Sequence, residues 1–213
     1  MSDDVVDTLL RKLEGKQVLI FDFDGTLADT SPLHDSAFNT VLAPMGVPVD
    51  YSSMAGLRTA DALVQCLAKA GKVVPEEQIK QLASAKQSAV RNLVSELLEP
   101  MPGVNEFLKW AKSRFQLAMY SSGSRGTVEL AVEKLGYAGW FCPMLCSEDV
   151  GFAKPHPEGY LKILEVLSVS AAKALVFEDS DPGIEAARRA GIETHDVRAV
   201  PFIQILLNQG FCD

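Results

Sequence analysis

The chain has little cysteine, and its cysteines form no pattern typical of a disulfide framework or a zinc site. Four cysteines are scattered over 213 residues without a C-x-x-C pair. A chain of this length buries roughly 70% of its unfolded surface without such a staple. Cys142 and Cys146 are four positions apart with no histidine nearby, which disfavours zinc. We therefore expect free thiols in a reducing cytoplasm.

The sequence also lacks an excess of positive charge and any long apolar run. Lys and Arg number 20 against 28 Asp and Glu, so the net charge is −8. This sign opposes nonspecific binding to nucleic acid or anionic membranes. No apolar run approaches the roughly 18 residues of a membrane span, and the first residues lack the apolar core of a secretory signal. We expect a soluble cytoplasmic protein that binds neither nucleic acid nor a membrane. No feature of the sequence requires more than a monomer.

Short apolar runs alternate with helical patterns along most of the chain. The runs are typical of buried parallel strands and lie at 17–23, 115–120, 143–146, 174–177 and 193–197. Helical patterns occupy 104–112, 128–135 and 159–167, and a last helix has Pro182 at its first position. Strands that alternate with helices predict an α/β fold with a doubly wound parallel sheet.

The stretch from about 29 to 99 interrupts this alternation. It shows no convincing strand, and three amphipathic patterns follow one another. One apolar face groups Phe38 with Leu42, a second Leu63, Val64 and Leu67, and a third pattern runs from Pro75 to Pro100. We predict a small all-helical cap domain, 29–99, inserted after the first strand into a catalytic core formed by 1–28 and 100–213. Such an insertion lies over the carboxyl end of the strand, where open α/β sheets bind ligands.

Two carboxylates follow the first predicted strand, in Asp22-Phe23-Asp24-Gly25-Thr26. A turn explains Asp24-Gly25, because both residue types favour turns. It does not explain Asp22, since an unpaired charge at the end of a buried strand is costly. Two like charges so close together need a cation or a shared proton.

A second acidic pair, Glu178-Asp179, follows the predicted strand 174–177. Carboxylates that converge on one sheet edge predict a Mg²⁺ site with oxygen ligands. Asp181, which precedes Pro182, is interpreted as a helix N-cap and is left out of the site.

Two further polar segments follow predicted strands. Ser121-Ser122-Gly123 offers a hydroxyl and loop amides suited to phosphate oxygens, although an ordinary βα loop has the same composition. Lys154-Pro155 follows the strand 143–146, and alone it is compatible with a surface lysine. The order of the segments, each at the tip of a successive strand, favours one common site.

The four segments together resemble the motifs of the haloacid-dehalogenase superfamily. They are DFDGTL from Asp22, then Ser121, then Lys154-Pro155, then FEDSDPGIEAARRAG around Glu178. The resemblance covers nearly the whole chain and implies a Rossmann-like core. The insertion is similar to the C1 cap of the branch with β-phosphoglucomutases and sugar phosphatases, fructose-1-phosphate phosphatases among them.

The resemblance implies a role for each residue of these segments. Asp22 would attack phosphorus to give an aspartyl-phosphate, and Asp24 would be the general acid and base. Lys154, Ser121 and the Ser122 amide would bind the phosphoryl group, with Gly25 and Thr26 beside it. Mg²⁺ would be held by the Asp22 carboxylate, the Asp24 carbonyl, Asp179 and Glu178, the last either directly or through water. The second aspartate favours phosphoryl transfer over dehalogenation.

Two residues of the predicted cap are candidates for substrate binding. His34 matches a histidine of related sugar-phosphate enzymes, and a surface or hinge position without a ligand role is the alternative. Arg58 lies in a segment similar to the cap specificity loop and suits a second phosphate or a sugar hydroxyl. Mutases carry the arginine one position later, where this chain has Thr59.

These observations predict a Mg²⁺-dependent phosphatase acting on a small phosphorylated metabolite, a phosphomonoester such as a sugar phosphate. A phosphomutase of the β-phosphoglucomutase type shares every core residue and is the first alternative. A non-catalytic sensor of metal and phosphate is the second, although it would be expected to have lost Asp22 or Asp24.

Overall fold

The computed structural model describes residues 9–54 and 57–202. Within them a five-stranded sheet has the order β3-β2-β1-β4-β5, and every neighbouring pair is parallel. The predicted α/β fold with a parallel sheet is confirmed. None of the helices in these two ranges is both long and apolar enough to cross a membrane.

The strands coincide with the five apolar runs; four of them are shorter than predicted, and β4 is one residue longer. They are β1 (Val18–Phe21), β2 (Gln116–Tyr120), β3 (Met144–Leu145), β4 (Ala174–Glu178) and β5 (Glu193–Asp196). β1 lies in the centre, between β2 and β4, and all four of its residues are buried. Because β1 ends at Phe21, Asp22 and Asp24 lie in the loop that leaves the sheet rather than on the strand.

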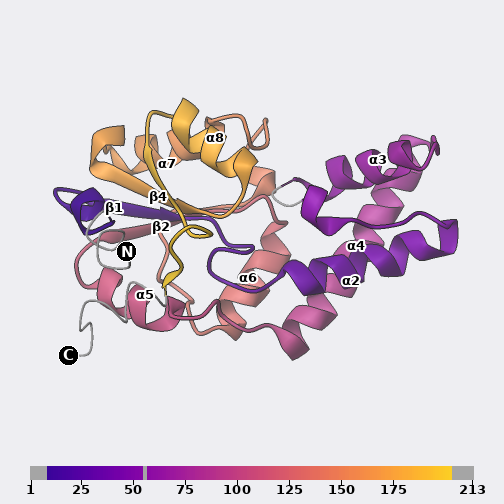
Figure 1. The fold of residues 1–213 in the computed structure, drawn as a ribbon, viewed down its shortest axis with the longest axis horizontal. Coiled ribbons are helices and arrows are strands. Elements are labelled where there is room, and N and C mark those ends of the chain that lie inside the picture. The colour runs from indigo at the N-terminus through magenta and orange to yellow at the C-terminus, as the bar shows by residue number, and fades with distance from the viewer. Residues whose placement is uncertain (1–8, 55–56, 203–213) are drawn as a thin grey trace.

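Helices cover both faces of the sheet (Figure 1). One face packs on α5 (Val104–Lys112) and α6 (Arg125–Lys134), with Phe21 and Phe177 stacked at 4.8 Å between ring centroids. The other packs on α7 (Glu158–Leu167) and α8 (Asp181–Arg189). Successive side chains of β1 point to opposite faces of the sheet, and both faces are buried, as expected of a parallel sheet.

Three longer helices lie to one side of the sheet, at the right of Figure 1: α2 (Ser31–Leu42), α3 (Thr59–Lys69) and α4 (Glu76–Leu97). They share a hydrophobic cluster of their own, whose buried members all fall between Phe38 and Ile79. The apolar face predicted for α3 is partly wrong, because Val64 is 53% exposed and Cys66 is buried in its place. Val90 and Val94 of α4 pack instead on the cluster of the α5–α6 face.

The chain leaves and re-enters the sheet region at adjacent points. The Asp29 amide donates to the Glu99 carbonyl at 3.1 Å, and the Met101 amide donates to the Leu27 carbonyl at 3.0 Å. Ala28 and Pro100 form an antiparallel bridge between these two contacts. The domain boundaries at 29 and 99 stay a prediction.

The N-terminal cap of α8 is Ser180, whose side chain accepts a hydrogen bond from the Gly183 amide at 3.2 Å. The prediction that Asp181 is the N-cap was therefore wrong by one position. Asp181 is the first residue of the helix, and its side chain forms an ion pair with Arg198 at 2.9 Å.

Candidate active site

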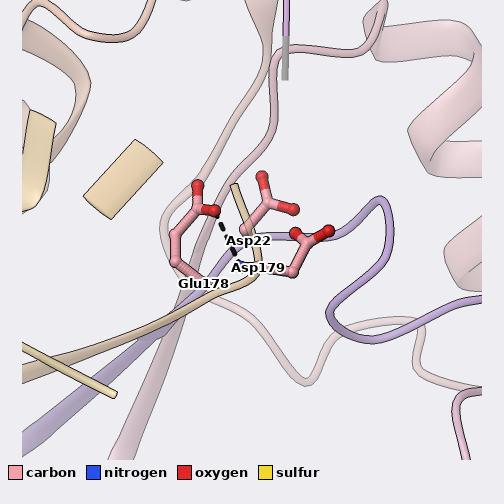
Figure 2. Close-up of side chains that lie close together, drawn as sticks. All are labelled: Asp22, Glu178 and Asp179. Carbon is pink, nitrogen blue, oxygen red and sulfur yellow. Dashed lines mark hydrogen bonds between the residues drawn. The ribbon is translucent and has the colours of Figure 1, made fainter. Parts of the chain in front are cut away.

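Three carboxylates meet at the carboxyl end of β1 and β4. One oxygen from each of Asp22, Glu178 and Asp179 lies within 4.8 Å of the others. Figure 2 shows the three side chains side by side, Asp22 from the loop after β1 and the other two from the end of β4. Parallel strands put their carboxyl ends at one edge, so residues about 155 positions apart become neighbours. Hard oxygen ligands in this number suit Mg²⁺.

Lys154 is the cation inside this cluster. Its Nζ donates to Asp22 Oδ1 at 2.6 Å, to Glu178 Oε1 at 2.5 Å and to the Tyr120 carbonyl at 3.2 Å. Its side chain is fully buried, and the two carboxylates raise its pKa well above the ordinary value although burial acts in the opposite direction. Lys154 therefore stays charged beside Asp22.

Glu178 differs from the other two carboxylates because protein donors occupy both of its oxygens. Oε1 accepts from Lys154 and from Tyr160 Oη at 3.3 Å, and Oε2 accepts from the amides of Asp179 and Ser180 and from Ser180 Oγ. A Cβ atom on Gly183 would lie 1.7 Å from Oε1, so α8 approaches Glu178 closely. In this arrangement Glu178 orients Lys154.

The two remaining acids of the cluster, Asp22 and Asp179, carry negative charge that Lys154 compensates only in part. Burial, chiefly, raises the pKa of Asp22 well above its ordinary value, and Glu178 and Asp179 add to the effect against Lys154. Burial, followed by the charge of Glu178, raises the pKa of Asp179 to about 7. Such shifts show that the cluster favours a bound proton or cation. The donor set therefore fits a divalent ion.

Asp24 points away from this cluster and toward the helices beside the sheet. Its Oδ1 lies 3.1 Å from His34 Nε2 and its Oδ2 accepts from Ser121 Oγ at 3.2 Å. Burial acts to raise the pKa of Asp24, but the charge and hydrogen bond of His34 outweigh it, and the pKa lies well below the ordinary value. The two aspartates of the first motif therefore have opposite electrostatic environments.

Lys86 was not among the residues predicted from the sequence. This lysine of α4 is 2% exposed, and its Nζ lies 2.6 Å from His34 Nδ1 and 4.7 Å from the centre of the Phe38 ring. Burial lowers its pKa to about 8, against the opposing charge of Asp24. A signal for it exists, because Lys86 falls between Ile79 and Val90 on the apolar stripe of an otherwise ordinary amphipathic helix.

The loop after β2 supplies donors beside Asp24. The Gly123 amide donates to Ser121 Oγ at 2.9 Å, which fixes the hydroxyl that contacts Asp24. Ser122 Oγ is buried and has no hydrogen-bond partner among the described residues. A buried hydroxyl without a partner is uncommon in proteins.

Gly25 and Thr26, predicted to lie beside the substrate, contact Asp179 instead. Thr26 Oγ1 donates to Asp179 Oδ1 at 3.1 Å. Gly25 has φ +85°, and a Cβ there would lie 2.2 Å from Asp179 Oδ2. Both residues therefore fix the position of a carboxylate of the cluster, and their predicted contact with substrate stays a prediction.

Arg58 bridges the helices beside the sheet and a loop of the sheet region. Its Nη2 donates to the carbonyls of Ser147 at 3.1 Å and Val150 at 2.6 Å. The guanidinium is thereby committed to two backbone oxygens, and its Nε is buried without a partner.

A small cavity separates the aspartates from these helices. Its volume is about 30 Å³, and Asp22, Asp24, His34, Tyr51, Lys86 and Ser122 are among its lining residues. This space holds about two water molecules. The cavity is therefore closed to a sugar phosphate in the described conformation.

Residues 19–197 match the family described as haloacid dehalogenase-like hydrolases. The chain belongs to this family. It is therefore a hydrolase, and the resemblance of its four motifs is confirmed at the level of the family.

Named relatives include phosphatases of phosphorylated carbohydrates. Fructose-1-phosphate phosphatase YqaB of Escherichia coli K12 is 32% identical over 186 residues, which cover 84% of this chain and 95% of YqaB. The phosphorylated carbohydrates phosphatase of Thermotoga maritima is 34% identical over 181 residues, 83% of this chain and 82% of the relative. The crystal structure of CbbY from Rhodobacter sphaeroides in complex with phosphate has a TM-score of 0.75 at 26% identity and covers 84% of each chain.

Proposed function

We propose that this hydrolase is a Mg²⁺-dependent phosphatase that acts on a small phosphorylated metabolite, a sugar phosphate in the first instance, through an aspartyl-phosphate. The observation that carries the proposal is the different setting of two aspartates two positions apart. Asp22 faces Lys154 and the carboxylate cluster, whereas Asp24 faces His34 and Ser121. One is suited to attack phosphorus and the other to move a proton.

Asp22, Asp179 and the Asp24 carbonyl would hold Mg²⁺, and Glu178 would act through Lys154 or through a water molecule. An anionic carboxylate and a phosphate dianion about 4 Å apart repel each other by several kcal/mol in a partly dry site. When bound, the ion supplies positive charge that offsets this repulsion. Lys154, which donates to Asp22 Oδ1, would supply the rest.

The reaction proceeds in two displacements. A carboxylate oxygen of Asp22 forms a bond to phosphorus, the bond from phosphorus to the alcohol oxygen breaks, and Asp24 gives that oxygen a proton. Water then attacks phosphorus, Asp24 takes its proton, and the bond to Asp22 breaks to release phosphate. The low pKa of Asp24 suits the second step. For the first step a proton can reach Asp24 by relay, from Lys86 Nζ to His34 Nδ1 and from His34 Nε2, 3.1 Å away, to the carboxylate.

A phosphomutase has the same core chemistry but must hold a second phosphate while the first is transferred. Arg58, the cation that we considered for that role, donates to two backbone carbonyls instead. The phosphatase is favoured on this ground. The sensor alternative is disfavoured because both aspartates are present in an ordered network.

Phosphate release from p-nitrophenyl phosphate, with and without Mg²⁺, tests the enzyme against the sensor. We expect Mg²⁺-dependent release, which a sensor would not show. β-Glucose 1-phosphate with a coupled assay for glucose 6-phosphate tests the phosphatase against the mutase. Stoichiometric glucose 6-phosphate, stimulated by a trace of the 1,6-bisphosphate, would replace the phosphatase with the mutase.

A further inference from the structure

We propose that the divalent ion of this site enters and leaves through a side pocket that is separate from the catalytic cavity. The inference rests on the proposed function, because it concerns the ion assigned there to Asp22 and Asp179, and it adds the path by which that ion exchanges with solvent. The side pocket, as we name it, has a volume of about 440 Å³. Its lining residues include Gly25, Asp29, Ser31, Asp179, Arg198 and Phe202.

Asp179 joins the side pocket to the carboxylate cluster. Thr26 donates to its Oδ1, and its Oδ2 lies 2.2 Å from the position that a Cβ on Gly25 would take. Gly25 and Thr26 line the side pocket as well, so the lack of a side chain at Gly25 leaves Oδ2 uncovered on that side. The catalytic cavity is bordered by Asp22 instead, and Asp179 is not among its described lining residues. The cluster therefore presents a different carboxylate to each of the two spaces.

The two spaces differ in whether a hydrated ion fits. Mg²⁺ gives up water ligands reluctantly and carries about six of them in solution. At the roughly 10–15 Å³ that one water needs in a cavity, this shell needs about 60–90 Å³. The catalytic cavity, at about 30 Å³, is too small for it, whereas the side pocket, at about 440 Å³, has ample room. Exchange through the side pocket therefore requires no opening of the catalytic cavity.

The charge of the side pocket favours a cation. Two acids line it, Asp179 and the more exposed Asp29. Arg198 is the cation among its described lining residues, and its guanidinium is paired with Asp181 at 2.9 Å and with Asp196 at 2.7 Å. A concave surface with an excess of negative charge raises the local concentration of cations and their rate of association. Asp29 therefore attracts the ion toward Asp179.

A bulky side chain at the side pocket tests the path. Ser31→Trp places an indole at an exposed lining position, and Ser36→Trp places one at an exposed position of the same helix that is not among the described lining residues. Stopped-flow luminescence of Tb³⁺, which also prefers oxygen ligands, gives the association rate, and mixing the complex with excess EDTA gives the dissociation rate. Rates rather than amplitudes are compared, because an added tryptophan itself excites Tb³⁺.

We expect Ser31→Trp to lower both rates at least fivefold and to leave Kd within twofold of wild type, because a narrowed passage slows entry and exit alike. Ser36→Trp should exchange Tb³⁺ at the wild-type rates. Thermal unfolding confirms that both variants are folded. Wild-type rates in a folded Ser31→Trp variant would overturn the proposal.

A change of charge tests the path without added bulk. Asp29→Lys should lower the association rate at least threefold at low ionic strength, and the effect should shrink in 0.5 M salt because salt screens exposed charges. Glu165→Lys changes the net charge equally at an exposed position of α7, and its association rate should stay within twofold of wild type. Equal rates in the two lysine variants would contradict attraction by Asp29.

Failure of the path and failure of the proposed function give different results. If Mg²⁺ does not displace Tb³⁺, or if Asp179→Asn binds Tb³⁺ as well as wild type does, the metal site fails and the path fails with it. If Mg²⁺ displaces Tb³⁺ and supports hydrolysis of p-nitrophenyl phosphate, but every variant exchanges Tb³⁺ at the wild-type rates, the proposed function stands and only the path is wrong.

Discussion

Asp22 and Asp24 show how strongly the surroundings of a side chain determine its chemistry. They belong to one loop, and yet the pKa of Asp22 lies well above and that of Asp24 below the ordinary value. Burial acts on both in the same direction. At Asp22, Lys154 opposes burial but Glu178 and Asp179 act in the same direction as burial, whereas at Asp24 the effect of His34 outweighs burial.

Asp22→Asn should remove essentially all turnover and leave the fold intact, because the amide is isosteric but cannot attack phosphorus. Phosphate release and thermal unfolding of the same preparation check both parts. Asp50→Asn, an exposed carboxylate of the helical insertion, is the matched control and should keep full activity. A tenth of the wild-type activity in the Asp22 variant would rule out direct attack by Asp22.

Gly25→Ala should weaken metal binding as well as stability. Its φ of +85° strains any L side chain, and its Cβ would displace the Asp179 carboxylate, 2.2 Å away. Gly46→Ala, at φ +66° with nothing within 4 Å, isolates the backbone strain. We expect each variant to lose about 1 kcal/mol of stability.

Only Gly25→Ala should also raise the Mg²⁺ concentration needed for half-maximal activity, by at least tenfold. Denaturant unfolding in EDTA and a Mg²⁺ titration separate the two effects. An equal Mg²⁺ requirement in both glycine variants would show that Gly25 does not position Asp179.

At the scale of elements, α2 and α4 place His34 against Asp24 and Lys86 against His34, both from outside the sheet. His34 lies in α2 and Lys86 in α4, and their 2.6 Å contact holds the imidazole with Nε2 on the carboxylate. Helices that lie outside the sheet region therefore determine how Asp24 gains and loses its proton.

Lys86→Met should lower kcat at least tenfold, because His34 loses the group that orients it. Stability should not fall. Burial lowers the pKa of Lys86 to about 8, so holding its charge at pH 7 costs the folded state free energy that methionine does not. Lys80→Met removes an exposed lysine of the same helix, paired with Glu76, and should change neither quantity. Unchanged kcat in the Lys86 variant would show that the lysine has no positioning role.

The elements also show what sequence can predict. Strand positions and the acidic tips were predictable because buried parallel strands are continuous apolar runs and their carboxyl ends meet at one edge. The Lys86 contact was not, since its partner lies 52 positions away and only packing between α2 and α4 brings them together. The role of Arg58 was equally hidden, because backbone carbonyls of Ser147 and Val150 have no signature in side-chain identity.

At the scale of the whole molecule, Mg²⁺ should stabilise the fold. The ionised cluster opposes folding because Lys154 compensates its charges only in part. Since the pKa of Asp179 is raised to about 7, this cost grows as the pH rises from the ordinary carboxyl pKa and is fully present above pH 7. Mg²⁺ at about 100 times its Kd adds roughly 2.7 kcal/mol, or about 5 to 10 °C in Tm.

Differential scanning calorimetry at pH 8, at constant ionic strength, measures this shift, and EDTA should reverse it together with activity. Asp179→Asn should lose the shift without lowering Tm in EDTA. Full activity in excess EDTA would show that the reaction needs no metal ion. An equal Tm shift in the variant would show that Asp179 does not bind Mg²⁺.

The chain leaves the sheet region at Ala28 and returns to it at Pro100, and these two residues pair with each other. This arrangement bears on how such a protein can evolve. Because the two crossing points already touch, a turn of about two to five residues could close the gap if everything between them were deleted. Exchange of the intervening segment for another would likewise leave the backbone of the sheet in place. A lineage could thus acquire a new ligand preference by replacing one contiguous stretch of gene, while Asp22, Asp24 and Lys154 descend unchanged.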